Sequence, residues 1–163
     1  RERQADLFIA LDAYTVLGPE ARGATIYTLS EKGSDAEAEA LAHKENRADI
    51  IAGIDLGTES EEVTDILIDL VQRESKSHSL LFARKAVAEM KTATHFTGKP
   101  LRSAGFVVLK APDVPSVLIE LGYLSSTHDE QQLVSLEWQK RVAAAMATAV
   151  DRYFQTEVAV RAD

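Results

Sequence analysis

Two carboxylates stand at the ends of apolar segments that have the character of buried strands. Glu120 interrupts the apolar stretch of residues 117–121, and Asp12 directly follows the apolar run of residues 7–11. Binding and catalytic sites of open α/β sheets form beyond the carboxyl ends of the strands. A carboxylate there is costly to bury unless it is paired, hydrogen-bonded or bound to a metal. Both residues are therefore candidates for acid–base or metal chemistry. The alternatives are a solvated strand end for Glu120 and a turn residue for Asp12.

Glu45 is a third candidate, on a predicted helix. At 100° per residue it falls on the same face as Leu41 and Ala48, the apolar side of that helix. An acidic group on an inward face requires a partner. The alternative is a side chain that extends past the edge of the apolar stripe into solvent.

Other familiar reactive patterns are missing from the sequence. It contains no cysteine, which excludes disulfides, thiolate metal sites and cysteine nucleophiles. The four histidines form no HxH or HxxxH pair, and we expect each of them at the surface, on a polar helix face or in a loop. There is no Gly-x-Ser-x-Gly nucleophile turn, and residues 53–57 lack the spacing of a phosphate-binding loop.

Composition limits the class of protein. The chain has 163 residues, of which 45% are apolar and 27% charged, as in a single globular domain. Its 18 basic and 26 acidic residues give a net charge of −8, which argues against general binding to nucleic acid or anionic membranes. We expect no membrane span, because no apolar run is long enough, and we find no secretion signal in these residues.

Strand and helix signals alternate along the chain, which predicts an α/β fold with three layers, a mostly parallel sheet flanked by helices. Residues 98–100 contain glycine and proline and predict a break. Residues 53–60 contain two glycines and predict a joint within one domain. The predicted strands are residues 7–11, 23–29, 106–109 and 117–121, and the predicted helices are residues 34–51, 58–72, 77–90 and 135–154, before a frayed tail.

Four segments together resemble a known family. Residues 5–11, 22–33, 44–46 (Lys-Glu-Asn) and 114–125 are similar, in this order, to the zinc-dependent N-acetylmuramoyl-L-alanine amidases. The resemblance is closest to the periplasmic amidases that separate daughter cells of Gram-negative bacteria. It implies a peptidoglycan hydrolase that cleaves the amide between N-acetylmuramic acid and the L-alanine of the stem peptide, with Zn²⁺ as cofactor.

The resemblance also assigns roles to the candidate residues. Glu120 matches the glutamate that acts as general base and acid, and Asp12 stands where the family has a histidine zinc ligand. The other two zinc ligands of the family lie before the segment that Arg1 matches, so the resemblance implies an incomplete zinc site here. Two interpretations remain: a portion of an active amidase domain, or a catalytically inactive relative that binds peptidoglycan or an activator protein.

The family's organisation implies a catalytic domain over residues 1–154, as its C-terminal portion, and a tail over residues 155–163. Residues 34–90 match a helical regulatory insertion, in which Glu45 would be the autoinhibitory residue that blocks the zinc site. The implied partners are peptidoglycan and a coiled-coil activator of the division machinery, and the implied location is the periplasm.

Overall fold

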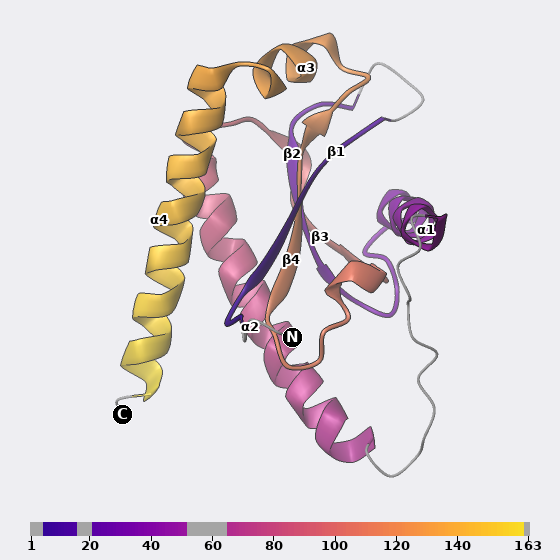
Figure 1. Ribbon diagram of the computed structural model, residues 1–163, viewed down its shortest axis with the longest axis vertical. Helices are drawn as coiled ribbons and strands as arrows, with labels where there is room; N and C mark the ends of the chain where they lie inside the picture. Colours follow the sequence, from indigo (N-terminus) through magenta and orange to yellow (C-terminus); the bar gives the residue numbers. More distant parts are fainter. Residues whose placement is uncertain (1–4, 16–20, 52–64, 162–163) are drawn as a thin grey trace. The chain divides into compact units, whose positions relative to one another are not determined.

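The computed structural model describes residues 5–15, 21–51 and 65–161 (Figure 1). The elements in chain order are β1 (Phe8–Tyr14), β2 (Ala24–Leu29), α1 (Ala36–Ile51), α2 (Asp65–Met90), β3 (Phe96–Ala104), the 3₁₀ helix η1 (Val107–Leu109), β4 (Ser116–Tyr123), α3 (Thr127–Leu133) and α4 (Leu136–Arg161). No helix in these ranges is long and apolar enough to cross a membrane.

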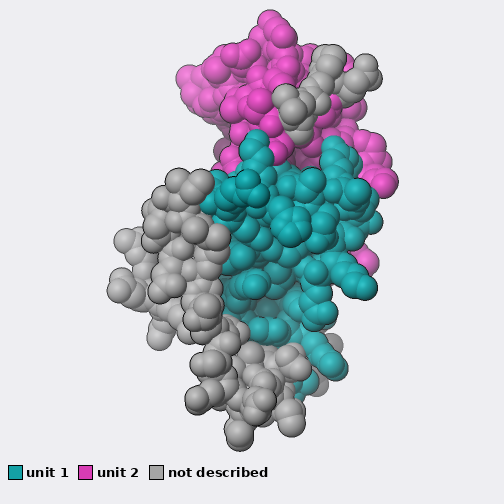
Figure 2. Space-filling model, turned by 90° about the vertical axis from the view of Figure 1, so that its right-hand side faces the viewer, with its two compact units in different colours: residues 1–10, 27–79, 102–118 teal, residues 11–26, 80–101, 119–163 magenta. Residues whose placement is uncertain are grey.

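The chain forms two compact units, coloured separately in Figure 2. Unit 1 comprises residues 1–10, 27–79 and 102–118, and unit 2 comprises residues 11–26, 80–101 and 119–163. Each unit has its own aromatic contact. In unit 1 the rings of Tyr27 and Phe106 meet edge to face at 5.1 Å, and in unit 2 those of Phe82 and Tyr153 do so at 5.7 Å. All four side chains are buried, so each unit contains a core.

One sheet with strand order β1-β4-β2-β3, flanked by helices, carries the fold. The amide of Phe8 donates to the carbonyl of Pro115, and the amide of Leu124 donates to that of Tyr14, so β1 and β4 run parallel. Main-chain bonds at both ends of β2 show that β2 and β3 are also parallel. The arrows of β4 and β2 point in opposite directions (Figure 1). The sheet is therefore mixed, and the expected parallel pairing holds on either side of one antiparallel pair.

The segment from residue 96 to residue 109 differs from the prediction. The expected break at residues 98–100 lies inside β3, and the expected strand at residues 106–109 is η1. In the sheet that the described residues form, β3 is an edge strand. A proline, which has no N–H group, is tolerated in such a strand because only one of its sides pairs with another strand. A short apolar run such as residues 106–109 does not by itself distinguish a strand from a helical turn.

Helix boundaries also differ. The two helices predicted over residues 58–72 and 77–90 are described as one helix, α2, from Asp65 onward. Ser77 does not begin a helix; its hydroxyl donates to the carbonyl of Arg73 within α2. α4 continues to Arg161, into the predicted tail, and α3 was not predicted. The helical repeat of Trp138, Val142, Ala145, Ala149 and Tyr153 predicts the inner face of α4; four of these side chains are buried, and Ala145 is half-buried. The predicted joint at residues 53–60 lies outside the described residues.

Candidate active site

Glu120 lies in β4, within unit 2, and its exposed fraction is 0%. β4 is buried from Ser116 to Glu120, so both faces of the strand are covered along this stretch. The interpretation as a solvated strand end is therefore wrong. A fully buried carboxylate loses its hydration, which is a large cost, and such groups are typical of sites with a chemical role.

Asp12 lies inside β1 rather than in a turn after it, because the strand continues to Tyr14. Its side chain is half-buried, and Oδ1 accepts the main-chain N–H of Ala13 at 2.7 Å. β1 and β4 are neighbours in the sheet. The main-chain bonds from Phe8 to Pro115 and from Leu124 to Tyr14 fix the register of this parallel pair. In that register Asp12 lies opposite Glu120 and Leu121. The structure thus brings the two predicted carboxylates to adjacent strands.

Glu45 belongs to unit 1 and is half-buried on α1. The predicted apolar stripe is shorter than expected: Ala38 and Leu41 are buried, but Ala48 is exposed. Glu45 therefore stands at the end of the buried face.

Its neighbour Asn46 makes the more distinctive contacts. The side-chain amide donates to the carbonyl of Gly105 and accepts the N–H of Val107, both at 2.8 Å. This pair of bonds fastens the second half of α1 to the segment that leads into η1. Sequence reasoning had no signal for this role, because an asparagine in a helix is by itself uninformative.

Asp129 was also missed, and it anchors the end of β4. The residue is buried, with 4% of its surface exposed, and Oδ2 accepts the N–H groups of Gly23 at 2.8 Å and of Tyr123 at 3.0 Å. A Cβ atom on Gly122 would lie 3.0 Å from Cβ of Asp129, so glycine leaves the room that this side chain occupies. The spacing Ser126-x-x-Asp129, a helix-capping pattern, was the available signal, and the Ser126 hydroxyl accepts the N–H of Asp129.

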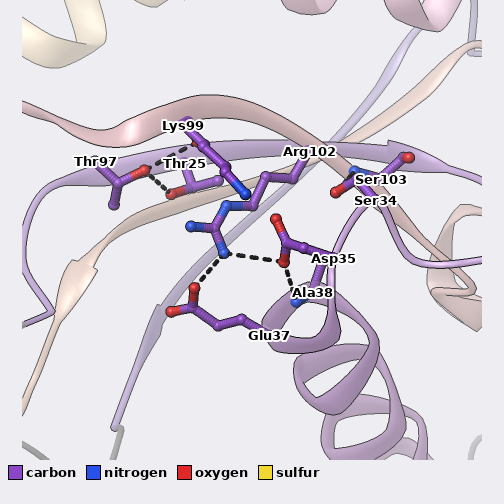
Figure 3. A network of polar contacts seen from close by, with 9 residues as sticks. All are labelled: Thr25, Ser34, Asp35, Glu37, Ala38, Thr97, Lys99, Arg102 and Ser103. Carbon is purple, nitrogen blue, oxygen red and sulfur yellow. Dashed lines mark hydrogen bonds and ion pairs between the residues drawn. The ribbon is translucent and has the colours of Figure 1, made fainter.

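An ion-pair network holds the first turn of α1 in unit 1 (Figure 3). Arg102, on β3, is 9% exposed, and its Nη1 lies 2.6 Å from Oε2 of Glu37 and 3.5 Å from Oδ1 of Asp35. The same Asp35 oxygen accepts the N–H of Ala38 and so caps the helix. Burial lowers the pKa of Arg102, but the hydrogen bond to Glu37 and the nearby charges outweigh it, so the pKa is raised and the guanidinium stays charged.

The described residues do not fit a zinc ion. Among residues 5–15, 21–51 and 65–161, no group of three or more histidine, cysteine, aspartate or glutamate side chains is arranged to hold a metal. Three of the histidines instead lie 3.4–3.8 Å from an acidic residue of their own helix.

Comparison with known proteins decides the family. Residues 1–152 match the family model Amidase_3, described as N-acetylmuramoyl-L-alanine amidase. The chain belongs to this family. AmiA of Escherichia coli (strain K12) is 34% identical over 151 residues, 92% of this chain and 52% of that protein. AmiC of Neisseria meningitidis serogroup B is 32% identical over 99% of this chain and 39% of that protein.

Solved structures agree on the fold of this Amidase_3 chain. The CwlD amidase from Clostridioides difficile, solved in complex with the GerS lipoprotein, has a TM-score of 0.61 at 15% identity, covering 94% of this chain and 56% of that one. The catalytic domain of CwlV from Bacillus (Paenibacillus) polymyxa has a TM-score of 0.59 at 19% identity, over 94% and 60%. The chain spans about half the length of the curated AmiA relatives that it matches.

Proposed function

We propose that this chain is part of a peptidoglycan hydrolase that cleaves the amide between N-acetylmuramic acid and the L-alanine of the stem peptide. The observation that supports it is the fully buried Glu120 on the central strand β4 of an Amidase_3 fold. Amide hydrolysis needs a group that accepts a proton from water and later protonates the amine that leaves. A carboxylate can do both.

In the proposed reaction, Glu120 accepts a proton from the attacking water as its oxygen bonds to the carbonyl carbon. When the C–N bond breaks, the same carboxyl group returns the proton to the nitrogen of L-alanine. The products are a lactyl carboxylate on the sugar and a stem peptide with a free amino terminus. Asp129 does not take part in these steps; it anchors β4 three residues beyond Glu120, through the N–H of Tyr123.

The catalytic role is tested by Glu120→Gln in the complete amidase domain, with purified muropeptides as substrate. Glutamine keeps the size of the side chain but cannot transfer the proton, so we expect turnover to fall by about 10²–10⁴-fold with the domain still folded. Glu130→Gln, at an exposed position on α3, is the matched control. Full activity of Glu120→Gln would show that another group is the base.

A second function is supported by the absence of a metal cluster among the described residues. It is a non-catalytic amidase-like domain that binds peptidoglycan or an activator. Zinc content after dialysis, together with turnover of muropeptides, separates the two. Zinc with turnover supports the enzyme, whereas binding to peptidoglycan sacculi without zinc or turnover supports the binding domain.

We further propose that the enzyme acts in the periplasm during daughter-cell separation and that residues 34–90 form a regulatory insertion. In this proposal Glu45 blocks the active centre until a coiled-coil activator displaces α1, which is a shift between two populated states. The CwlD amidase, which shares this fold, is solved in complex with the GerS lipoprotein, so an amidase of this fold can bind a protein partner. Glu45→Ala should raise basal turnover of the complete domain, and Asp49→Ala on the same helix should not. Equal basal turnover for Glu45→Ala and the unchanged domain would contradict the assignment.

A further inference from the structure

Unit 1 contains a pocket of about 460 Å³. It is bounded by α1, by the first half of α2, by the end of β2 and by the segment around η1. Its volume lies within the range of sites that hold small ligands, about 300–1,000 Å³. None of Glu120, Asp12 and Glu45 lines it among the described residues, so the proposed catalytic chemistry does not account for it.

Both basic and acidic side chains line the pocket. Lys76 of α2 and Lys110, just after η1, both line it. Neither makes an ion pair with any residue in the described ranges. Glu39 and His43 also line the pocket, but they lie 3.7 Å from each other and Glu39 accepts the N–H of Gly33, so these two side chains already have partners. The two lysines provide two positive groups for carboxylates of a ligand.

The other side chains that line the pocket indicate which further groups the ligand has. Glu31 also lines the pocket and, within the described residues, has no ion pair, which leaves a negative group for a ligand cation. Leu29 and Ala42 add apolar surface suited to a short aliphatic side chain. Asn46 adds little, because both ends of its amide are already bonded to the main chain.

From these groups we infer that the pocket binds a short peptide with a free amino terminus and two carboxylates, the peptide product of amidase cleavage. Lys76 and Lys110 bind the carboxylates, and Glu31 binds the ammonium group. This assignment of the ligand rests on the proposed function, because hydrolysis of the amide creates the free amine of L-alanine. The uncleaved substrate lacks that amine, so the pocket would distinguish product from substrate.

The test uses this chain and the dipeptide L-alanyl-γ-D-glutamate, which carries one ammonium and two carboxylates, with binding followed by calorimetry and amide NMR shifts at low salt. We expect shifts confined to the walls of the pocket. Lys76→Gln and Lys110→Gln should each weaken binding about two- to fivefold, the effect of one exposed charge pair. Lys140→Gln, at an exposed position on α4, should leave it unchanged. The N-acetylated dipeptide should bind more weakly by a similar factor, and Glu31→Gln should remove that difference.

Two results would overturn the inference. Either the dipeptide produces no shifts at the pocket, or the lysine variants bind it as the unchanged chain does. Equal binding of the acetylated and free dipeptides would overturn the assignment of the ligand as product. None of these results affects the catalytic proposal, since Glu120 is judged by turnover and this site by binding.

Discussion

Replacing Asp129 by alanine should destabilise the protein far more than its place in a short surface helix suggests. The carboxylate accepts two main-chain N–H groups, from Gly23 and Tyr123, and both residues are buried. A hydrogen bond to a charged group contributes roughly 1.5–3 kcal/mol to stability. Losing both bonds would therefore cost about 3–6 kcal/mol if no water replaced the carboxylate at the two N–H groups. Local opening that admits water reduces this, and we expect about 3 kcal/mol. A whole domain is stable by only about 5–15 kcal/mol, so this is a large fraction.

Urea unfolding followed by circular dichroism measures this loss, and hydrogen exchange of the Gly23 and Tyr123 amides shows where it acts. Asp129→Asn keeps one acceptor oxygen without the charge and should cost about half as much. Glu130→Ala, exposed on the same helix, should change stability by less than about 0.5 kcal/mol. If Asp129→Ala costs no more than Glu130→Ala, or leaves the exchange of both amides unchanged, Asp129 does not anchor β4.

Three further variants test the attachment of α1. Asn46→Ala removes two hydrogen bonds of 2.8 Å, so the free energy of unfolding should fall by about 1–3 kcal/mol and hydrogen exchange at Val107 should become faster. Asn46→Asp keeps the acceptor for Val107, so its stability should lie between those of Asn46→Ala and the unchanged chain. Unchanged exchange at Val107 would contradict this role. Arg102→Met should cost about 1–3 kcal/mol in urea unfolding, because it leaves two carboxylates without their cation, and the loss should shrink at high salt. A loss that does not depend on salt would mean that Arg102 acts through packing alone.

Several elements could be predicted because their local signals agree with their tertiary setting. β2 and β4 are short runs rich in apolar or β-branched residues, and both lie inside the sheet, buried along most of their length. The inner face of α4 follows a helical repeat that begins at Trp138 and ends at Tyr153. In such segments the residues whose types favour a strand or a helix are also the residues that are buried in the folded protein.

β3 could not be predicted because its residues favour another structure. Gly98 and Pro100 are poor strand formers, and the strand exists because β2 supplies a partner along one side. The burial of Arg102, which is 9% exposed, could not be predicted either. A basic residue is expected in solvent, and its burial depends on two carboxylates that are more than 60 residues away in the sequence.

The candidate site was predictable where a residue conflicts with its surroundings. Glu120 is conspicuous as an acid within an apolar run, and it is fully buried. Asp129 creates no such conflict, because it follows a serine in an ordinary capping pattern. Its partners are Gly23, 106 residues earlier, and Tyr123, so only the folded chain reveals what it joins.

The contacts of α1 bear on the regulatory proposal. Within the described residues, its buried side chains are Ala38, Leu41 and Ala42, which together remove little apolar surface from water. Polar contacts hold the helix at both ends, with Arg102 at the first turn and Asn46 in the second half. Water and salt can replace contacts of this kind at modest cost, whereas exposure of a large apolar face would be prohibitive. The regulatory proposal requires that α1 leave its place without unfolding the core, and a helix attached mainly by polar contacts is suited to such a step.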